Sequence, residues 1–195
     1  MKRNNSDKGL GWHNYTVLYD KLFEGIRYND LRIFELGIGT NNVALPSNMG
    51  PNGTPGASLR GWKEYFPNSL VFGADIDSDI LFSEDRIQTF YCDQTNPCSI
   101  SQMWGTIPEN FDIMIDDGLH KYDANVTFFE NSIYKLNRGG FYIIEDVLDY
   151  IIPQFESKIV EWRDKYPHLE FKLEIVKHDH NILDNNLIIV RNCQS

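Results

Sequence analysis

The feature that most constrains the fold of this sequence is a repeated alternation of short apolar runs with longer amphipathic segments. Seven apolar runs are candidate strands: residues 31–36, 69–76, 87–92, 111–116, 140–145, 171–177 and 186–191. Most are continuously apolar, which is typical of strands covered on both faces of a sheet. Candidate helices lie between them: residues 56–66, 79–85, 99–104, 121–136 and 153–166. Strands that alternate with helices predict right-handed crossovers and a mostly parallel sheet.

The two ends of the chain depart from this alternation. Apolar residues recur at intervals of three or four positions from Tyr15 to Ile26, which predicts an amphipathic helix in an N-terminal helical segment, residues 1–30. The last two apolar runs are separated only by HDHNILDNN, which predicts a hairpin. We therefore expect a single α/β domain over residues 1–195, with a doubly wound, seven-stranded, mostly parallel sheet and an antiparallel C-terminal hairpin strand.

Composition and charge argue against several classes of protein. Hydrophobic residues make up 42% and charged residues 24% of the 195, which is ordinary for a globular chain with a buried core. No apolar stretch approaches the roughly 18 residues of a membrane helix, so we expect no membrane insertion. Without a signal-peptide pattern, three cysteines that lack metal-site spacing indicate reduced thiols and a cytoplasmic location. The net charge of −10 disfavours nucleic acid and suits a cationic ligand.

The first predicted strand leads into a glycine-containing turn, FELGIGTNN. Gly37 and Gly39 permit close approach of a ligand, but the third glycine of a dinucleotide motif is missing. Glu35 would repel a pyrophosphate and would suit a cation. Asp75 and Asp93 end the second and third strands, where acids bind ribose hydroxyls or an adenine amino group. Each acid alone is more often a strand end or helix cap, but together they favour a nucleoside pocket.

An unusually long connection separates the glycine turn from the second strand. Asp75 stands 38 residues beyond Gly37, compared with about 20 in dinucleotide-binding folds. The excess is VALPSNMGPNGTPGAS, which is rich in Gly, Pro and Asn. This composition predicts an inserted loop, residues 42–58, over the site.

A second group of acids follows the fourth and fifth candidate strands. FDIMIDDGLH places Asp117 and His120 after one strand, and FYIIED ends the other in Glu145 and Asp146. Ligands bind outside the carboxyl ends of such strands, so these side chains should share a crevice. Magnesium prefers hard oxygen ligands and favours the alkoxide of a bound hydroxyl, while an imidazole can accept the proton. We expect Asp116 mainly to support the turn, as a helix cap.

Six stretches together resemble a known family: DKGLGWHNYT, FELGIG, GASLRGWKEYFPNSLVFGADI, CDQ, FDIMIDDGLH and GGFYIIEDV. They resemble the class I S-adenosylmethionine-dependent methyltransferases. Within these, they are most similar to the metal-dependent O-methyltransferases of macrolide sugars and their cephalosporin-biosynthesis relatives. The resemblance covers roughly residues 7–150. In one departure from the family pattern, Leu119 stands where a small polar residue is usual.

The resemblance implies a role for each matched position. The magnesium ligands would be Asp117, Glu145 and Asp146, and His120 would be the catalytic base. The residues that bind S-adenosylmethionine would be Glu35, Gly37, Gly39, Ser58, Asp75, Asp93 and Asp116.

We therefore expect a Mg²⁺-dependent O-methyltransferase that moves a methyl group from S-adenosylmethionine to a hydroxyl of a sugar or glycosylated small molecule. The partner would be a small-molecule or glycan acceptor, and a homo-oligomer remains open. A nicotinamide-dependent oxidoreductase is the alternative enzyme, and the incomplete glycine motif and Glu35 disfavour it. A nucleoside-binding module without catalysis is the non-enzymatic alternative.

Overall fold

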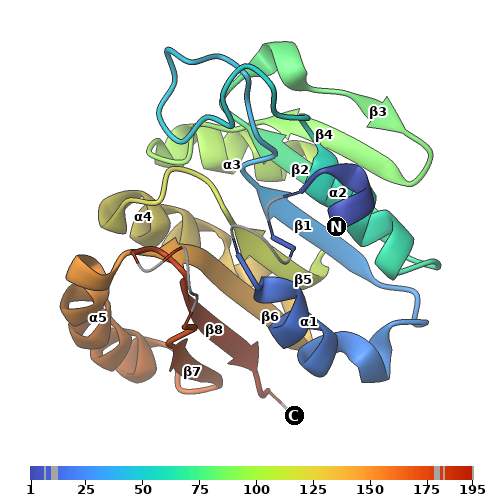
Figure 1. Cartoon of the computed structure of the whole chain (residues 1–195). Helices are drawn as coiled ribbons and strands as arrows, with labels where there is room; N and C mark the ends of the chain where they lie inside the picture. The colour runs from blue at the N-terminus through green and yellow to red at the C-terminus, as the bar shows by residue number, and fades with distance from the viewer. Residues whose placement is uncertain (7, 10–12, 178–180, 182, 195) are drawn as a thin grey trace.

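One mixed sheet forms the centre of the molecule (Figure 1). The computed structural model describes the chain except for residues 7, 10–12, 178–180, 182 and 195. In the described part, eight strands occur in the order β3-β4-β2-β1-β5-β6-β8-β7. They are β1 (Arg32–Leu36), β2 (Leu70–Asp75), β3 (Ser83–Glu84), β4 (Ile87–Tyr91), β5 (Phe111–Asp116), β6 (Leu136–Val147), β7 (Leu169–Glu174) and β8 (Asn186–Asn192).

The strand directions confirm the predicted fold class. Strands β4, β2, β1, β5 and β6 are parallel, whereas β8 runs antiparallel to both β6 and β7. The sheet has one more strand than the seven predicted, because the predicted helix at 79–85 is wrong. That segment forms a short 3-10 helix, Ser78–Ile80, and then β3, which pairs with β4 through a turn at Arg86 (φ 60°).

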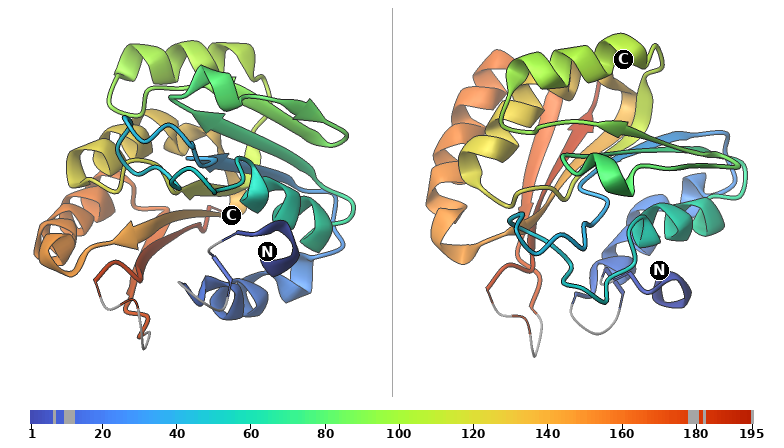
Figure 2. Two further views of the ribbon diagram at one scale, coloured as in Figure 1. Left: turned by 45° about the horizontal axis from the view of Figure 1, so that its top comes forward. Right: turned by 90° about the horizontal axis from the view of Figure 1, so that it is seen from above.

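Helices cover both faces of the sheet (Figure 2). The α-helices are α1 (Tyr15–Phe23), α2 (Ala57–Tyr65), α3 (Pro97–Thr106), α4 (Tyr122–Ser132) and α5 (Ile152–Lys165). Further 3-10 turns lie at Lys2–Asn4, Glu24–Ile26, Ile133–Lys135 and Asp149–Ile151. No helix in the described ranges combines the length and the apolar character that a bilayer crossing requires.

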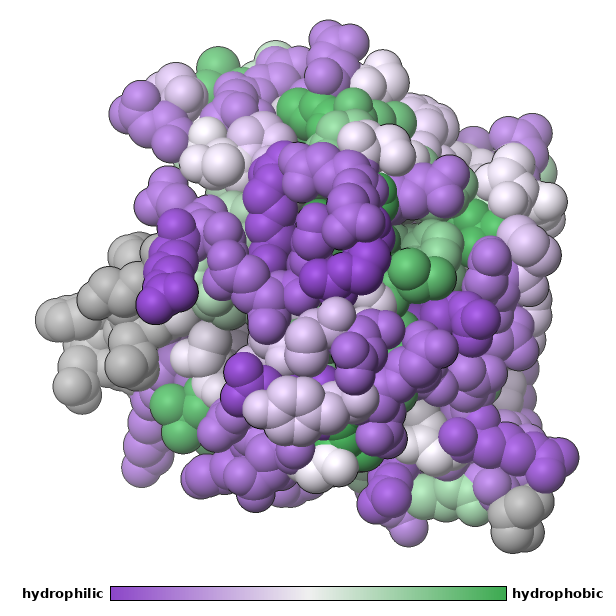
Figure 3. Space-filling model, turned by 90° about the vertical axis from the view of Figure 1, so that its right-hand side faces the viewer, coloured by the Kyte–Doolittle hydropathy of each residue, from purple (hydrophilic) through white to green (hydrophobic). Residues whose placement is uncertain are grey.

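Each face of the sheet has its own apolar core. Helices α1 and α2 pack on one face, and α3, α4 and α5 pack on the other. Alternate residues of the central strands enter opposite cores, as Ile33 and Phe34 of β1 do. Burial on both faces explains why these strands are continuously apolar in sequence. On the outer surface, the face on the right in Figure 1 is mostly hydrophilic, with small separate apolar patches (Figure 3).

The carboxyl ends of β1, β2 and β5 are joined at one glycine. The Gly37 N–H donates to the Ala74 carbonyl at 2.8 Å, and the Asp117 N–H donates to the Leu36 carbonyl at 2.9 Å. Gly37 has φ +83°, and a Cβ built on it would lie 2.0 Å from the Asp117 carbonyl oxygen. A side chain at this position would therefore separate the turn after β1 from the turn after β5.

Gly37→Ala should destabilise the fold by more than about 1 kcal/mol, because it adds left-handed backbone strain to a backbone clash. The measurement is urea denaturation followed by circular dichroism. The matched control is Gly25→Ala, where a Cβ would meet nothing within 4 Å. We expect that control to unfold at or above the wild-type midpoint. Equal midpoints for the two variants would contradict the close approach at Gly37.

Candidate active site

A pocket of about 390 Å³ opens at the carboxyl ends of the parallel strands. Its walls include the turns after β1, β2, β4 and β5 and the end of β6. The pocket brings together most of the predicted site residues: Gly37, Gly39, Ser58, Asp75, Asp93, Asp117, His120 and Asp146. Residues 45–49 of the predicted inserted loop also line it. The remaining predicted residues, Glu35, Asp116 and Glu145, lie behind the pocket wall in the described structure.

On one side of the pocket, backbone N–H groups orient two acids. Asp75 accepts hydrogen bonds from the N–H groups of Ile38 at 2.9 Å and Asp77 at 3.0 Å. Its burial raises the pKa of the carboxyl, which these hydrogen bonds oppose. Asp93 accepts from the N–H and the hydroxyl of Thr95, at 2.9 and 2.7 Å. Asp75 is therefore fixed against the glycine turn, and Asp93 is fixed within the turn after β4.

Glu35 is fully buried between β1 and α2. Its carboxylate accepts hydrogen bonds from the Ser58 hydroxyl and the Trp62 indole N–H. Burial raises the pKa of Glu35, and the nearby charge of Lys8 opposes this shift. Glu35 therefore influences the pocket indirectly, because its partner Ser58 lines the pocket.

Asp116 is also fully buried, at the end of β5. It accepts hydrogen bonds from the side-chain amides of Gln94 at 2.7 Å and Asn125 at 3.0 Å. Burial raises the pKa of Asp116 to about 6. Gln94 in turn accepts from the Leu119 N–H at 2.8 Å. These contacts hold the turn that presents the next three residues to the pocket.

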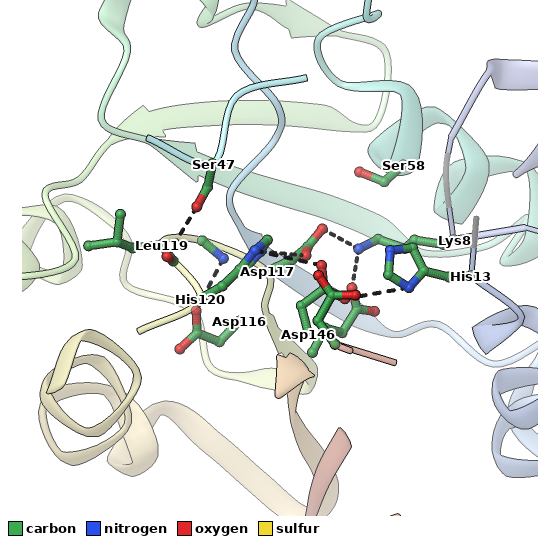
Figure 4. Close-up of polar contacts among 12 residues, drawn as sticks. Lys8, His13, Ser47, Ser58, Asp116, Asp117, Leu119, His120 and Asp146 are labelled. Atoms are coloured by element: carbon green, nitrogen blue, oxygen red, sulfur yellow. Dashed lines mark hydrogen bonds and ion pairs between the residues drawn. The ribbon is translucent and has the colours of Figure 1, made fainter. Parts of the chain in front are cut away.

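Leu119, the departure from the family pattern, lines the pocket mouth. Its carbonyl accepts a hydrogen bond from the Ser47 hydroxyl at 3.0 Å (Figure 4). The contact ties the long connection after β1 to the turn after β5. The main chain of Leu119 is thereby anchored between Asp117, the predicted metal ligand, and His120, the predicted base, while its side chain points away from both (Figure 4).

Asp117, His120 and Asp146 form a cluster that could hold a metal ion (Figure 4). One ligand atom from each lies within 4.8 Å of the others. His120 Nε2 is 3.2 Å from Asp117 Oδ1, and His120 Nδ1 is 3.6 Å from Asp146 Oδ2. The two carboxylates are oxygen ligands that fit magnesium or a similar hard divalent ion, whereas an imidazole nitrogen is a more usual ligand of transition metals.

The charges of this cluster shift its proton affinities. Burial lowers the pKa of His120, but the hydrogen bond to Asp117 and the charge of Asp146 outweigh it and raise the pKa to about 10. Burial opposes ionisation of Asp117, but Lys8 and His120 hold its pKa well below the usual range. Burial raises the pKa of Asp146 to about 6. The carboxylates thus favour a cation between them.

Two residues of the same cluster carry backbone strain. His120 has φ 55° and Asp146 has φ 53°, and both values lie in the left-handed region that non-glycine residues rarely adopt. The pairing of β6 with β8 shifts register between Ile144 and Val147, which is the signature of a bulge. The bulge lets two consecutive residues turn in different directions. Strain of this kind persists where the surrounding structure enforces it, as at functional sites.

The bulge separates Glu145 from Asp146. Asp146 lines the pocket and accepts a hydrogen bond from the Tyr15 hydroxyl at 2.7 Å. Glu145 is buried behind it, where Tyr19 and Lys8 donate to its carboxylate. Burial raises the pKa of Glu145 above its ordinary value, and Lys8 opposes this shift. Of the two acids, only Asp146 belongs to the cluster of metal-binding geometry in the described structure.

No family model matches the chain. Two enzymes of Streptomyces olivaceus are similar in sequence. The 8-demethyl-8-alpha-L-rhamnosyl tetracenomycin-C 2'-O-methyltransferase is 35% identical over 155 residues, which are 80% of this chain and 38% of that protein. The 8-demethyl-8-(2-methoxy-alpha-L-rhamnosyl)-tetracenomycin-C 3'-O-methyltransferase is 34% identical over 153 residues, which are 78% of this chain and 37% of that protein.

The methyltransferase MycE of the mycinamycin biosynthetic pathway is similar in structure. Its complex with Mg and SAH aligns with a TM-score of 0.74 at 25% identity, over 98% of this chain and 53% of MycE. A complex that also contains mycinamycin VI gives a TM-score of 0.73 at 25% identity and the same two coverages. The chain has the fold of the class I S-adenosylmethionine-dependent methyltransferases. It spans less than two fifths of the two Streptomyces relatives.

Several residues of this site were not assigned a role from the sequence. Lys8, Tyr19 and Gln94 hold the buried acids, and Asp184 lines the pocket. Lys8 lies in DKGLGWHNYT, one of the stretches that carried the resemblance, and this was the available signal for it. His13, from the same stretch, also lines the pocket and faces Asn185 at 3.0 Å.

The contact between His120 and Asp117 should make the stability of the metal-free chain depend on pH. The pKa of His120 is about 10 in the folded chain, against about 6.5 for an exposed imidazole. The stabilisation is therefore complete below pH 6.5 and is lost as the pH rises through 10. In EDTA, His120→Gln should lower the free energy of unfolding by about 1–3 kcal/mol at pH 6, and by less at each higher pH.

Urea denaturation at a series of pH values measures this difference. The control is His168→Gln, since His168 is exposed on the connection between α5 and β7. It should change the free energy of unfolding by less than about 0.5 kcal/mol throughout. A loss for His120→Gln that grows as the pH rises would contradict the expected sign.

Proposed function

We propose that this chain is the cofactor- and metal-binding part of a Mg²⁺-dependent O-methyltransferase that acts on a hydroxyl of a sugar or glycosylated small molecule. The observation that carries the proposal is the position of the Asp117–His120–Asp146 cluster in the same pocket as the glycine turn and Asp75. A methyl donor bound at one side would present its methyl group to an acceptor held at the other. The names of the Streptomyces relatives, which are sugar O-methyltransferases, support the acceptor class.

The glycine-turn side of the pocket suits S-adenosylmethionine. Asp75 would accept hydrogen bonds from the ribose hydroxyls, and Asp93 would accept one from the adenine amino group. Gly37 and Gly39 would let the backbone approach the ligand closely. The nearby acidic groups favour a ligand that carries a positive sulfonium. Ser58, held by Glu35, would face the methionine end.

Asp117 and Asp146 would hold the metal ion, with Glu145 behind them. A bound Mg²⁺ would supply positive charge that favours the alkoxide form of the acceptor hydroxyl. With that charge compensating the two carboxylates, His120 no longer has to remain protonated between them. A ring nitrogen of His120 could then accept the hydroxyl proton, and the pocket would align the acceptor oxygen with the methyl group.

The acceptor would enter beside Asp146, where Ser6, His13 and Asp184 line the same pocket. Asp184 Oδ1 is buried and has no hydrogen-bond partner in the described part of the chain. Its main chain lies against the same tyrosine as Asp146, because the Asp184 carbonyl oxygen is 3.1 Å from the Tyr15 hydroxyl. A buried acceptor atom without a partner is costly, and a donor hydroxyl of a sugar would satisfy it.

We infer a small-molecule acceptor and a cytoplasmic location for this chain. A small-molecule acceptor fits a pocket of about 390 Å³ better than a polymer would. All three cysteines are free thiols, which supports a cytoplasmic location.

The cofactor proposal is tested by calorimetry with S-adenosylhomocysteine and with NAD. We expect S-adenosylhomocysteine, the spent methyl donor, to bind and NAD not to bind, because the turn lacks the third glycine and contains Glu35. Asp75→Ala should weaken S-adenosylhomocysteine binding by about tenfold or more, through lost charge-assisted hydrogen bonds. Tight NAD binding without S-adenosylhomocysteine binding would instead support the oxidoreductase alternative.

Asp146→Asn and His120→Ala should each reduce methyl transfer by at least about 100-fold, the former by weakening the metal site and the latter by removing the base. Methyl transfer to a panel of methyl glycosides, measured as S-adenosylhomocysteine release, reports the rate. S-adenosylhomocysteine affinity should stay within about threefold of wild type, since neither residue lies on the nucleoside side. Full activity of the wild-type chain in EDTA would exclude the metal.

Asp184→Ala should raise KM for an accepted methyl glycoside by about tenfold, which is the effect of one lost hydrogen bond to a charged group. The turnover number and S-adenosylhomocysteine affinity should change little. Asp164→Asn is the control, because Asp164 is exposed on α5 away from the pocket. If Asp184→Ala lowers S-adenosylhomocysteine affinity and leaves KM unchanged, Asp184 does not contact the acceptor.

A further inference from the structure

A lysine of the N-terminal segment is buried in the centre of the acidic site (Figure 4). Lys8 is 1% exposed, and its ammonium group donates hydrogen bonds to Asp117 Oδ2 and Glu145 Oε2. It also lies 3.7 Å from Glu35 Oε1. The three carboxylates come from β1, from the turn after β5 and from β6. One cation therefore joins three neighbouring elements of the sheet.

Lys8 can be buried because the neighbouring carboxylates compensate its charge. An isolated ammonium group loses several kcal/mol of hydration on burial, so lysine is almost never buried without a counter-charge. The converse holds for Glu35 and Glu145, which are 0% and 1% exposed. Without Lys8, these buried carboxylates and Asp117 would repel one another across the ends of adjacent strands. Lys8 is therefore a structural requirement of the acidic site.

Lys8 also fixes the chain on which it lies. Its carbonyl accepts a hydrogen bond from the Thr16 N–H at 3.3 Å, which links it to the start of α1. Its N–H donates to the Ser6 hydroxyl at 3.4 Å, and Ser6 lines the pocket. The buried side chain thus draws the N-terminal segment against the carboxyl ends of the strands, where it forms part of the pocket wall.

We propose that Lys8 is the resident counter-cation of the acidic site: a positioning residue that holds Asp117 and Glu145 in place, ties the N-terminal segment to the pocket and moderates the affinity for the divalent metal ion. The metal part of this inference rests on the proposed function. The ammonium group shares Asp117 with the metal cluster, so its positive charge repels any divalent ion bound there. Lys8 therefore stabilises the empty site and weakens metal binding at the same time.

The test is the affinity of the full chain for Mg²⁺, measured by calorimetry in saturating S-adenosylhomocysteine. Lys8→Met keeps most of the side-chain volume and removes the charge. We expect it to bind Mg²⁺ at least about tenfold more tightly, the effect of a unit charge a few ångströms from a divalent ion even at the dielectric constant of water. Lys8→Arg, which keeps the charge, should stay much closer to wild type.

Two further measurements separate this role from simple packing. Thermal unfolding in EDTA should show Lys8→Met less stable than wild type, and Mg²⁺ should raise its midpoint more than it raises that of wild type. Lys158→Met is the matched control, because Lys158 pairs with Glu130 and Glu161 away from the pocket. It should leave both the Mg²⁺ affinity and the Mg²⁺-induced shift unchanged.

If Lys8→Met does not fold, the comparison moves to the Glu145→Gln background, where removal of both members of the buried pair is better tolerated. The double variant should again bind Mg²⁺ more tightly than Glu145→Gln alone. Equal or weaker Mg²⁺ binding after loss of Lys8, in either background, overturns the inference while the proposed function stands. Failure of the wild-type chain to bind Mg²⁺ overturns the proposed metal and this inference together.

Discussion

The close approach of Gly37 to the main chain of Asp117 is the constraint on which the site depends. It brings the turn after β1 within hydrogen-bonding distance of the turn after β5. One turn belongs to the side of the pocket that suits a nucleoside, and the other carries the acids that suit a metal. Because only a glycine fits between them, the two sides share one pocket rather than two separate clefts.

Repulsion between acidic side chains is the second constraint, and it opposes the close approach of the strand ends. Convergence of strand ends places Glu35, Asp117, Glu145 and Asp146 near one another, and three of these are nearly inaccessible to water. Such a cluster is unfavourable unless cations lie between its members. Lys8 and a protonated His120 provide positive charge between these carboxylates. Positive-φ backbone at His120 and Asp146 adds strain that the surrounding packing has to offset.

Most of the fold was predictable because its signals are local. Apolar runs gave the seven principal strands to within a few residues, and the short link before β8 gave the antiparallel hairpin. The segment at 79–85 was predicted wrongly because its pairing partner, β4, supplies the hydrogen bonds that make β3 a strand. Strands of two residues have too little pattern of their own to be recognised.

The sequence by itself determined the sheet, the edge at which acids gather and the resemblance to the class I methyltransferases. It could not separate Glu145 from Asp146, because adjacent acids look alike in sequence while a bulge in β6 turns one into the core and the other into the pocket. Nor could it place Lys8 beside Asp117, 109 positions further along the chain. Such pairings are decided by which distant segments share a buried space, and only the tertiary structure specifies that.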